Sequence, residues 1–203
     1  TAKRAKASPG ITLKHWKRSR TCEGERKLDE VFVSSEPVFA GKLLYVHVDT
    51  VRLPNGNTAT REMADHQGAV AVVPVLPDGR IIFVKQYRHP MGTVMYEIPA
   101  GKIDPGETPA QCVRRELSEE TGYEADTWEY LGPIATTPGF TNEVIYLYAA
   151  KDLHKHEQHT DADEFISVEA IPVAKLRPMV EDGLLFDSKT LAALGLMYLK
   201  KLF

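Results

Sequence analysis

The sequence has few cysteines and no long apolar run. Its two cysteines, Cys22 and Cys112, are too few for a disulfide framework, and we expect both to be reduced thiols. Apolar stretches such as residues 69–76 are far shorter than the roughly 20 residues that a membrane-spanning helix needs. These absences argue against a disulfide-stapled scaffold and a helical membrane protein, and no membrane partner is predicted.

An excess of positive charge is also missing. The 25 Lys and Arg residues are outnumbered by 28 Asp and Glu residues, so the formal net charge is −3 and nucleic acid is a disfavoured partner. The local exception is the stretch 1–21, which is rich in basic residues and contains no acid. It lacks the apolar core of a secretory signal, so we predict a cytoplasmic protein. A solvated tail is the favoured interpretation of this stretch, and an arm that contacts anions is the alternative.

Alternating apolar and polar residues predict strands along much of the chain. Residues 30–51 predict two strands joined near residues 40–41. Residues 69–76 predict a buried strand, and residues 81–86 are expected to pair back against it after the turn at 77–79. Further strands are predicted at 94–98, 128–134, 144–149 and 165–171.

Capping signals predict a helix that begins after Thr108. Thr108 suits the N-cap, Pro109 the first helical position, and Gln111 completes a capping-box pattern. Gly122 supplies the matching C-terminal stop. Two more helices are predicted at 173–182 and 188–202. Because strands and helices mix without a repeating strand-helix period, the pattern favours an α+β fold or a mixed-sheet sandwich over a doubly wound fold.

The helix after Thr108 carries a cluster of acids. Glu116, Glu119 and Glu120 are three and four residues apart, which places them on one helix face within a turn. Their charges repel, and the helix dipole opposes negative charge near the C-terminal end. Oxygen ligands of this kind suit Mg²⁺ or Mn²⁺ better than zinc. An ordinary solvated acidic helix face is the alternative.

The loop before this helix completes a longer pattern. Gly101 is followed after five residues by Glu107 and after seven more by 115–117, and then come 119–120 and Gly122. This spacing resembles the Nudix box of the Nudix hydrolases. The resemblance implies a Nudix-type α/β/α sandwich with a mixed central sheet and a small N-terminal antiparallel β-sheet.

The resemblance also implies roles for residues of the box. Glu116 and Glu120 correspond to metal ligands, together with Glu119 and the backbone carbonyl of Ala100. Mg²⁺ is the expected cofactor, and Mn²⁺ is a possible substitute. Glu119 and Arg115 are also predicted to serve catalysis, Arg115 by holding a carboxylate such as that of Glu107 through paired hydrogen bonds.

Residues outside the box resemble one Nudix subfamily, the ADP-ribose pyrophosphatases. The segment 137–143 resembles a loop of that subfamily, whose glutamate, here Glu143, is the candidate base that activates water. One of the helix glutamates is the alternative base, and an ordinary surface turn is the alternative interpretation of the segment. Similar stretches lie at 61–62, 86–88, 97–101, 163–165 and 187–190.

These stretches supply the predicted substrate-binding residues. Guanidinium groups bind phosphate oxygens through two parallel hydrogen bonds, so Arg61 and Arg88 suit a diphosphate, although surface salt bridges are the alternative for each. The aromatic residue that would stack on the base stays open among Trp16, Phe39 and Tyr45. The full substrate-binding set is Arg61, Glu62, Arg88, Glu97 and Gly139.

The resemblance covers roughly residues 28–200 and implies how the chain is divided. We expect a basic N-terminal extension at 1–27, an N-terminal β-sheet region for dimerisation at 28–66, and a catalytic Nudix domain at 67–203. A homodimer with two-fold symmetry is implied.

The implied reaction splits the pyrophosphate bond of ADP-ribose into AMP and ribose 5-phosphate. The substrate would be a small nucleoside diphosphate. Another sugar nucleotide such as GDP-mannose is the first alternative. RNA 5′-end hydrolysis and a non-catalytic Nudix-like ligand sensor are the others.

Overall fold

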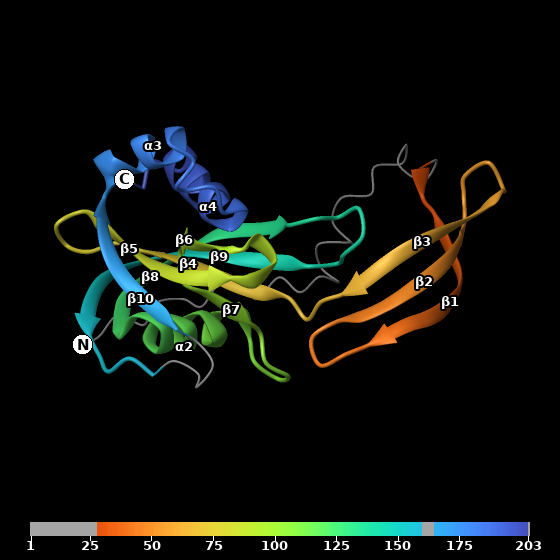
Figure 1. Ribbon diagram of the computed structural model, residues 1–203, viewed down its shortest axis with the longest axis horizontal. Helices are drawn as coiled ribbons and strands as arrows, with labels where there is room; N and C mark the ends of the chain where they lie inside the picture. Colours follow the sequence, from red (N-terminus) through yellow and green to blue (C-terminus); the bar gives the residue numbers. More distant parts are fainter. Residues whose placement is uncertain (1–27, 160–164, 203) are drawn as a thin grey trace, which may run out of the picture. The chain divides into compact units, whose positions relative to one another are not determined.

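A computed structural model of the chain describes residues 28–159 and 165–202 (Figure 1). The contacts divide the chain into two units, of which the first ends at Asp65 and the second begins at His66. The predictions for the basic extension 1–27 and for Cys22 lie outside the described residues.

The N-terminal unit contains an antiparallel sheet with the strand order β1-β2-β3. The two strands predicted within residues 30–51 are confirmed as β1 and β2. The third strand follows a tight turn in which the Gly56 N–H donates to the Leu53 carbonyl at 2.9 Å. The strands are β1 (Val31–Ala40), β2 (Tyr45–Arg52) and β3 (Thr58–Asp65).

His47 is a buried histidine on the central strand of this sheet. Its Nδ1 lies 2.9 Å from the Ser35 hydroxyl and 2.8 Å from Asp49 Oδ1, and its Nε2 lies 3.4 Å from Asp65 Oδ2. Burial alone would lower the pKa of His47. The hydrogen bond and charge of Asp49, together with the charge of Asp65, outweigh burial and raise this pKa above its ordinary 6.5.

The N-terminal unit is therefore expected to lose stability as the pH rises through the pKa of His47. The carboxylates favour the imidazolium in the folded state, so its stabilising contribution is complete below pH 6.5 and disappears above the raised pKa. An NMR titration of the imidazole protons checks this, and Asp49→Asn should lower the measured pKa. A wild-type pKa of 6.5 or less would contradict the prediction.

The second unit begins with a four-stranded mixed sheet in the order β7-β4-β9-β8. Strand β4 runs parallel to β9 and antiparallel to β7. A second, antiparallel sheet has the order β10-β5-β6. The strands are β4 (Ala69–Pro74), β5 (Arg80–Arg88), β6 (Thr93–Glu97), β7 (Ala100–Lys102), β8 (Tyr123–Ala135), β9 (Val144–Lys155) and β10 (Ile166–Pro172).

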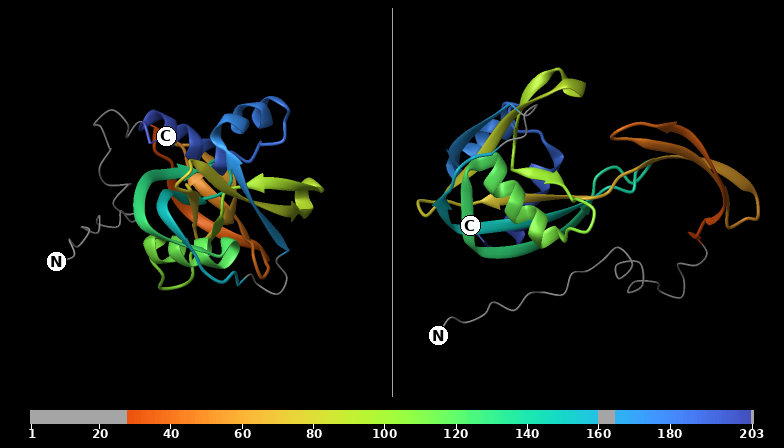
Figure 2. Two further views of the ribbon diagram at one scale, coloured as in Figure 1. Left: turned by 90° about the vertical axis from the view of Figure 1, so that its left-hand side faces the viewer. Right: turned by 90° about the horizontal axis from the view of Figure 1, so that it is seen from below.

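Helices cover both sides of these sheets. Figure 1 shows α2 on one side of the strands and α3 and α4 on the other, and Figure 2 shows α2 lying across the strands. The helices are α2 (Pro109–Thr121), α3 (Val173–Glu181) and α4 (Ser188–Leu199), with a short 3-10 helix η2 (His89–Met91) after β5. The predicted α/β/α sandwich is confirmed.

The apolar run of β4 is buried on both faces because β4 lies between the helix layers. Ala69, Ala71 and Val73 pack in the core that includes Ala193 and Met197 of α4. The intervening residues, Val70 and Val72, pack with Val113 and Leu117 of α2. Successive side chains of a strand point to opposite faces, so one apolar strand contributes to both cores.

The predicted pairing of residues 81–86 with 69–76 is wrong apart from one bridge, between Val75 and Ile81. The turn does reverse the chain, as the Gly79 N–H donates to the Leu76 carbonyl at 2.9 Å. Beyond it, β5 pairs with β10 and β6 in the other sheet. Both edges of β4 are already paired, with β7 and β9, so no edge is left for β5.

The helix predicted after Thr108 is confirmed as α2. The Gln111 N–H donates to the Thr108 hydroxyl and the Thr108 N–H to the Gln111 side chain, which forms the capping box. Gly122 ends the helix with a φ of 67°, where a side chain is disfavoured. Cys112 of α2 is a buried free thiol. No helix within 28–159 or 165–202 is long and apolar enough to cross a membrane.

Candidate active site

Arg115 lies among the acids of α2. Its Nη1 donates to Glu116 Oε1 at 2.7 Å and to Glu119 Oε2 at 2.9 Å. Its Nε and Nη2 donate to the two carboxylate oxygens of Glu107 at 3.1 and 3.0 Å. These hydrogen bonds raise the pKa of Arg115 and lower that of Glu107, so both groups stay charged. One guanidinium thus offsets the repulsion among these carboxylates.

The other acids of the helix reach the backbone of β7. Glu120 is 5% exposed, and its Oε2 accepts a hydrogen bond from the Ala100 N–H at 3.0 Å. The Glu116 carboxylate packs on Gly101 so closely that a Cβ there would lie 1.9 Å from its carboxyl carbon. The absence of a side chain at Gly101 therefore makes room for Glu116.

The carboxylates of α2 have different partners. Within the described part of the chain, no three His, Cys, Asp or Glu side chains are arranged to hold a metal ion. Glu116 and Glu119 bind Arg115, whereas Glu120 binds the Ala100 N–H. The donor atoms are nevertheless all oxygens. The missing side chain at Gly101 leaves room for one of these groups, the Glu116 carboxylate. This set fits a hard divalent cation.

Replacing Gly101 by Ala is expected to damage the site more than the fold. The added methyl would displace the flexible end of Glu116, so kcat/KM should fall roughly 10-fold or more, as when a supporting contact of a metal site is lost. The melting temperature should change by only a few degrees. Gly195→Ala is the matched control, because a Cβ there has no atom within 4 Å. Equal kcat/KM values for the two variants would refute this role of Gly101.

Two more predicted residues, Arg88 and the buried Glu97, are paired at the ends of β5 and β6. Glu97 accepts from Nε and Nη2 of Arg88 at 2.6 and 2.8 Å, and also from Nζ of Lys189. The Glu97 side chain is 3% exposed, whereas that of Arg88 is 41% exposed. Burial alone would raise the pKa of Glu97, but the hydrogen bonds from Arg88 and the charge of Lys189 outweigh it and lower this pKa.

The start of α4 fixes the segment that follows Glu97. Asp187 caps α4 by accepting from the Thr190 N–H at 3.0 Å, and the Thr190 hydroxyl accepts from the Ile98 N–H at 3.0 Å. The segment 97–101 is therefore held by α4 on one side and by Glu120 of α2 on the other. Sequence reasoning noted the stretch 187–190 only as a resemblance and gave Lys189 and Thr190 no role.

The candidate base Glu143 lies in the β8–β9 loop, which also contains the exposed Gly139. The Thr136 hydroxyl donates to Glu143 Oε2 at 2.6 Å, and His66 Nε2 lies 3.4 Å from Glu143 Oε1. The strand register pairs Ile145 with Ala69, so Glu143 lies near the start of β4. Neither His66 nor Thr136 was predicted from the sequence.

The remaining predicted residues lie in the N-terminal unit and stay predictions. Arg61 and Glu62 are neighbours on β3, so their side chains point to opposite faces of the sheet. Arg61 Nε donates to Glu30 Oε2 at 3.0 Å, which is the surface salt bridge considered as the alternative. Of the candidate stacking aromatics, Phe39 and Tyr45 are exposed, and Trp16 lies outside the described residues.

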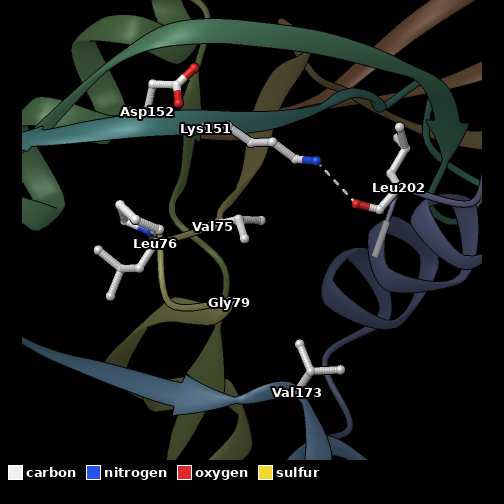
Figure 3. A pocket seen from close by; sticks show the side chains of 8 residues that line it. Val75, Leu76, Gly79, Lys151, Asp152, Val173 and Leu202 are labelled. Atoms are coloured by element: carbon white, nitrogen blue, oxygen red, sulfur yellow. Dashed lines mark hydrogen bonds between the residues drawn. The ribbon is translucent and has the colours of Figure 1, made fainter.

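A cavity of about 510 Å³ lies elsewhere in the second unit, beside the β4–β5 turn (Figure 3). Lys151 Nζ donates to the Leu202 carbonyl across it at 3.2 Å. None of the predicted site residues lines this cavity. Its lining consists of Val75, Leu76, Pro77, Gly79, Lys151, Asp152, Val173 and Leu202.

Models of known families match both parts of the chain. The NUDIX domain model matches residues 65–194, and the model of the nucleoside diphosphate sugar hydrolase N-terminal domain matches residues 32–63. A solved structure of an ADP compounds hydrolase superposes with a TM-score of 0.77 and 24% identity, and the match covers 84% of this chain and 94% of that one. This likeness confirms the fold.

Several characterised proteins are similar in sequence. The chain is 40% identical to a methanol dehydrogenase activator of Bacillus methanolicus, over 85% of this chain and 95% of that protein. It is 38% identical to an ADP-ribose pyrophosphatase of Bacillus subtilis, over 87% and 96% respectively. It is 32% identical to a GDP-mannose pyrophosphatase of Yersinia enterocolitica, over 66% and 75%. With the box residues placed on α2 and β7 and these matches across its length, the chain belongs to the Nudix hydrolase family.

Proposed function

We propose that this protein hydrolyses the pyrophosphate bond of ADP-ribose to AMP and ribose 5-phosphate. The proposal of hydrolysis rests on the acids of α2 that contact the backbone of β7. The choice of ADP-ribose is supported by the 38% identity to an ADP-ribose pyrophosphatase over 96% of that protein's length.

Nudix hydrolases use divalent metal ions, and we propose Mg²⁺ here, with Mn²⁺ as a possible substitute. Its ligands would be Glu116, Glu119, Glu120 and the backbone carbonyl of Ala100. When bound, the cation would neutralise charge on the diphosphate and so ease attack by water. Arg115 would hold the spacing of the carboxylates and limit their repulsion in the metal-free protein.

Arg88 is the proposed diphosphate-binding residue of the second unit. Its side chain is 41% exposed, although two of its nitrogens bind Glu97. We propose that Glu97, which is buried, contributes to substrate binding by orienting Arg88. Gly139 of the β8–β9 loop, together with Arg61 and Glu62 of the N-terminal unit, completes the proposed substrate-binding set.

Glu143 is the proposed base. It would take a proton from the attacking water as the water oxygen bonds to phosphorus and the bridging P–O bond breaks, leaving the second phosphate with the electron pair. One of the glutamates of α2, in particular Glu119, is the alternative base. Both assignments use groups of the second unit alone.

The exposed β1 strand supports a proposed homodimer. All ten residues of β1 are exposed, and its apolar side chains include Phe32 at 60% and Phe39 at 56% exposure. Exposed apolar side chains on one strand favour burial against a second copy of the chain. Light scattering in solution should therefore give twice the chain mass of 22.7 kDa, whereas a monomeric mass would contradict the dimer. A cytoplasmic location stays a prediction.

A substrate panel tests the proposed function. We expect kcat/KM for ADP-ribose to exceed that for GDP-mannose, diadenosine polyphosphates and a capped RNA. Preference for GDP-mannose would move the function to the nucleotide sugar suggested by the 32% identical relative. No hydrolysis of any of them, with ADP-ribose bound in calorimetry, would support the ligand sensor.

A further inference from the structure

We propose that His66 is a positioning residue that holds the Glu143 carboxylate in one orientation for proton abstraction. The proposal rests on the proposed function of Glu143 and adds a residue that no sequence motif indicated. His66 is the first residue of the second unit and lies just before β4. Both residues thus belong to the same unit.

The backbone around His66 fixes which ring nitrogen carries the proton. The Gly68 N–H donates to His66 Nδ1 at 3.1 Å, so Nδ1 acts as an acceptor. A neutral imidazole has one acceptor and one donor nitrogen, so the hydrogen must be on Nε2. Nε2 is the atom that lies 3.4 Å from Glu143 Oε1. In the neutral ring, the protonated nitrogen is therefore the one nearer to the candidate base.

Glu143 is held at both carboxylate oxygens. His66 faces Oε1, and the Thr136 hydroxyl donates to Oε2 at 2.6 Å. These two contacts restrict the rotation of the carboxylate. Catalytic hydrogen bonds are often long in the absence of substrate, so a separation of 3.4 Å is compatible with a positioning role for His66.

His66 also ties the loop itself to the start of β4. Its backbone N–H donates to the Asn142 side-chain oxygen at 2.8 Å. The loop is closed by the Thr136 N–H and the Glu143 carbonyl, which are 3.4 Å apart. The ring of His66 keeps its own proton throughout, because the proton from water goes to Glu143. Its role is therefore to orient the base.

Two substitutions separate the two contacts of the ring, with the Gly68 N–H and with Glu143. In His66→Asn, the amide oxygen can replace Nδ1 as acceptor for the Gly68 N–H, but the side chain is too short to reach Glu143. In His66→Gln, the amide nitrogen can replace Nε2 as donor to Glu143, but the Gly68 N–H loses its acceptor. The pair thus isolates the contact with the base.

We expect His66→Asn to lower kcat roughly 10- to 100-fold, the size seen when a group that orients a functional residue is lost. His66→Gln should restore most of kcat, and KM should change little in either variant. If His66→Asn retains kcat and His66→Gln loses it, only the contact of the ring with the Gly68 N–H matters, and the proposal is overturned. Equal losses of kcat in the two variants, accompanied by equal losses of melting temperature, would overturn the proposal as well.

Two further measurements keep this test separate from the substrate assignment. Ring ¹⁵N NMR shifts of the wild type should show Nδ1 unprotonated and Nε2 protonated, and Glu143→Gln should shift the Nε2 signal. The reverse tautomer would overturn the proposal even if ADP-ribose is the substrate. In the Glu143→Gln background, His66→Asn should not lower kcat further, and an additive loss would contradict the coupling.

Discussion

Glu120→Gln is expected to lower kcat for ADP-ribose by roughly 100-fold or more, because one charged group that stabilises the reaction is lost. Glu120 is the most buried of the three α2 acids proposed as metal ligands, at 5% exposure. The Gln side chain keeps an oxygen that can accept from the Ala100 N–H, so the position of β7 should not change. The loss should therefore come from charge rather than from structure.

The measurements are steady-state kinetics beside thermal unfolding without metal. The melting temperature of Glu120→Gln should match that of the wild type within a few degrees, and Mn²⁺ binding followed by paramagnetic resonance should weaken. Glu181→Gln is the control, since it makes the same change on the exposed surface of α3. Unimpaired hydrolysis by Glu120→Gln would refute the metal role of this residue.

The second large effect is expected at Glu97. Removing one partner from a buried group of charges costs about 3–5 kcal/mol, because the remaining charges are left without their counterion. Glu97→Gln would leave the buried Lys189 with only Asp187, at 3.0 Å, and would release Arg88. We therefore expect a lower free energy of unfolding by about that amount.

Urea unfolding checks this value against Glu129→Gln. The Glu129 side chain is 55% exposed, so this substitution should change the free energy of unfolding little. A change below about 1 kcal/mol would show that the contacts of Glu97 with Arg88 and Lys189 do not stabilise the fold. Because Arg88 loses its orientation, KM for ADP-ribose should rise as well. A lower free energy of unfolding with an unchanged KM would limit Glu97 to a structural role.

The elements best predicted from sequence are those with local signals. Helix α2 is marked by Thr108, Gln111 and Gly122, whose capping interactions span only a few residues. The strand β3 was not predicted separately, because its sequence contains mostly polar and charged residues and little apolar alternation. The apolar run of β4 predicted burial, but its neighbours depend on which edges are occupied by distant strands.

The same distinction applies to the candidate site. The acids of α2 were found because the spacing of the Nudix box lies within one segment. The residues that hold the segment 97–101 were missed because they are far away in sequence: Lys189 is 92 residues from Glu97, and Thr190 is 92 residues from Ile98. His66 meets Glu143 only because β4 and β9 are adjacent and parallel. No pattern in a single sequence shows such pairings.

The most direct test of the central claim is to add Mg²⁺ back to metal-free protein and follow AMP release from ADP-ribose. We expect no AMP release without metal and a rate that saturates as the Mg²⁺ concentration rises. AMP and ribose 5-phosphate should form in equal amounts. Hydrolysis at the same rate in the presence of a chelator, or none at any Mg²⁺ concentration, would contradict this claim.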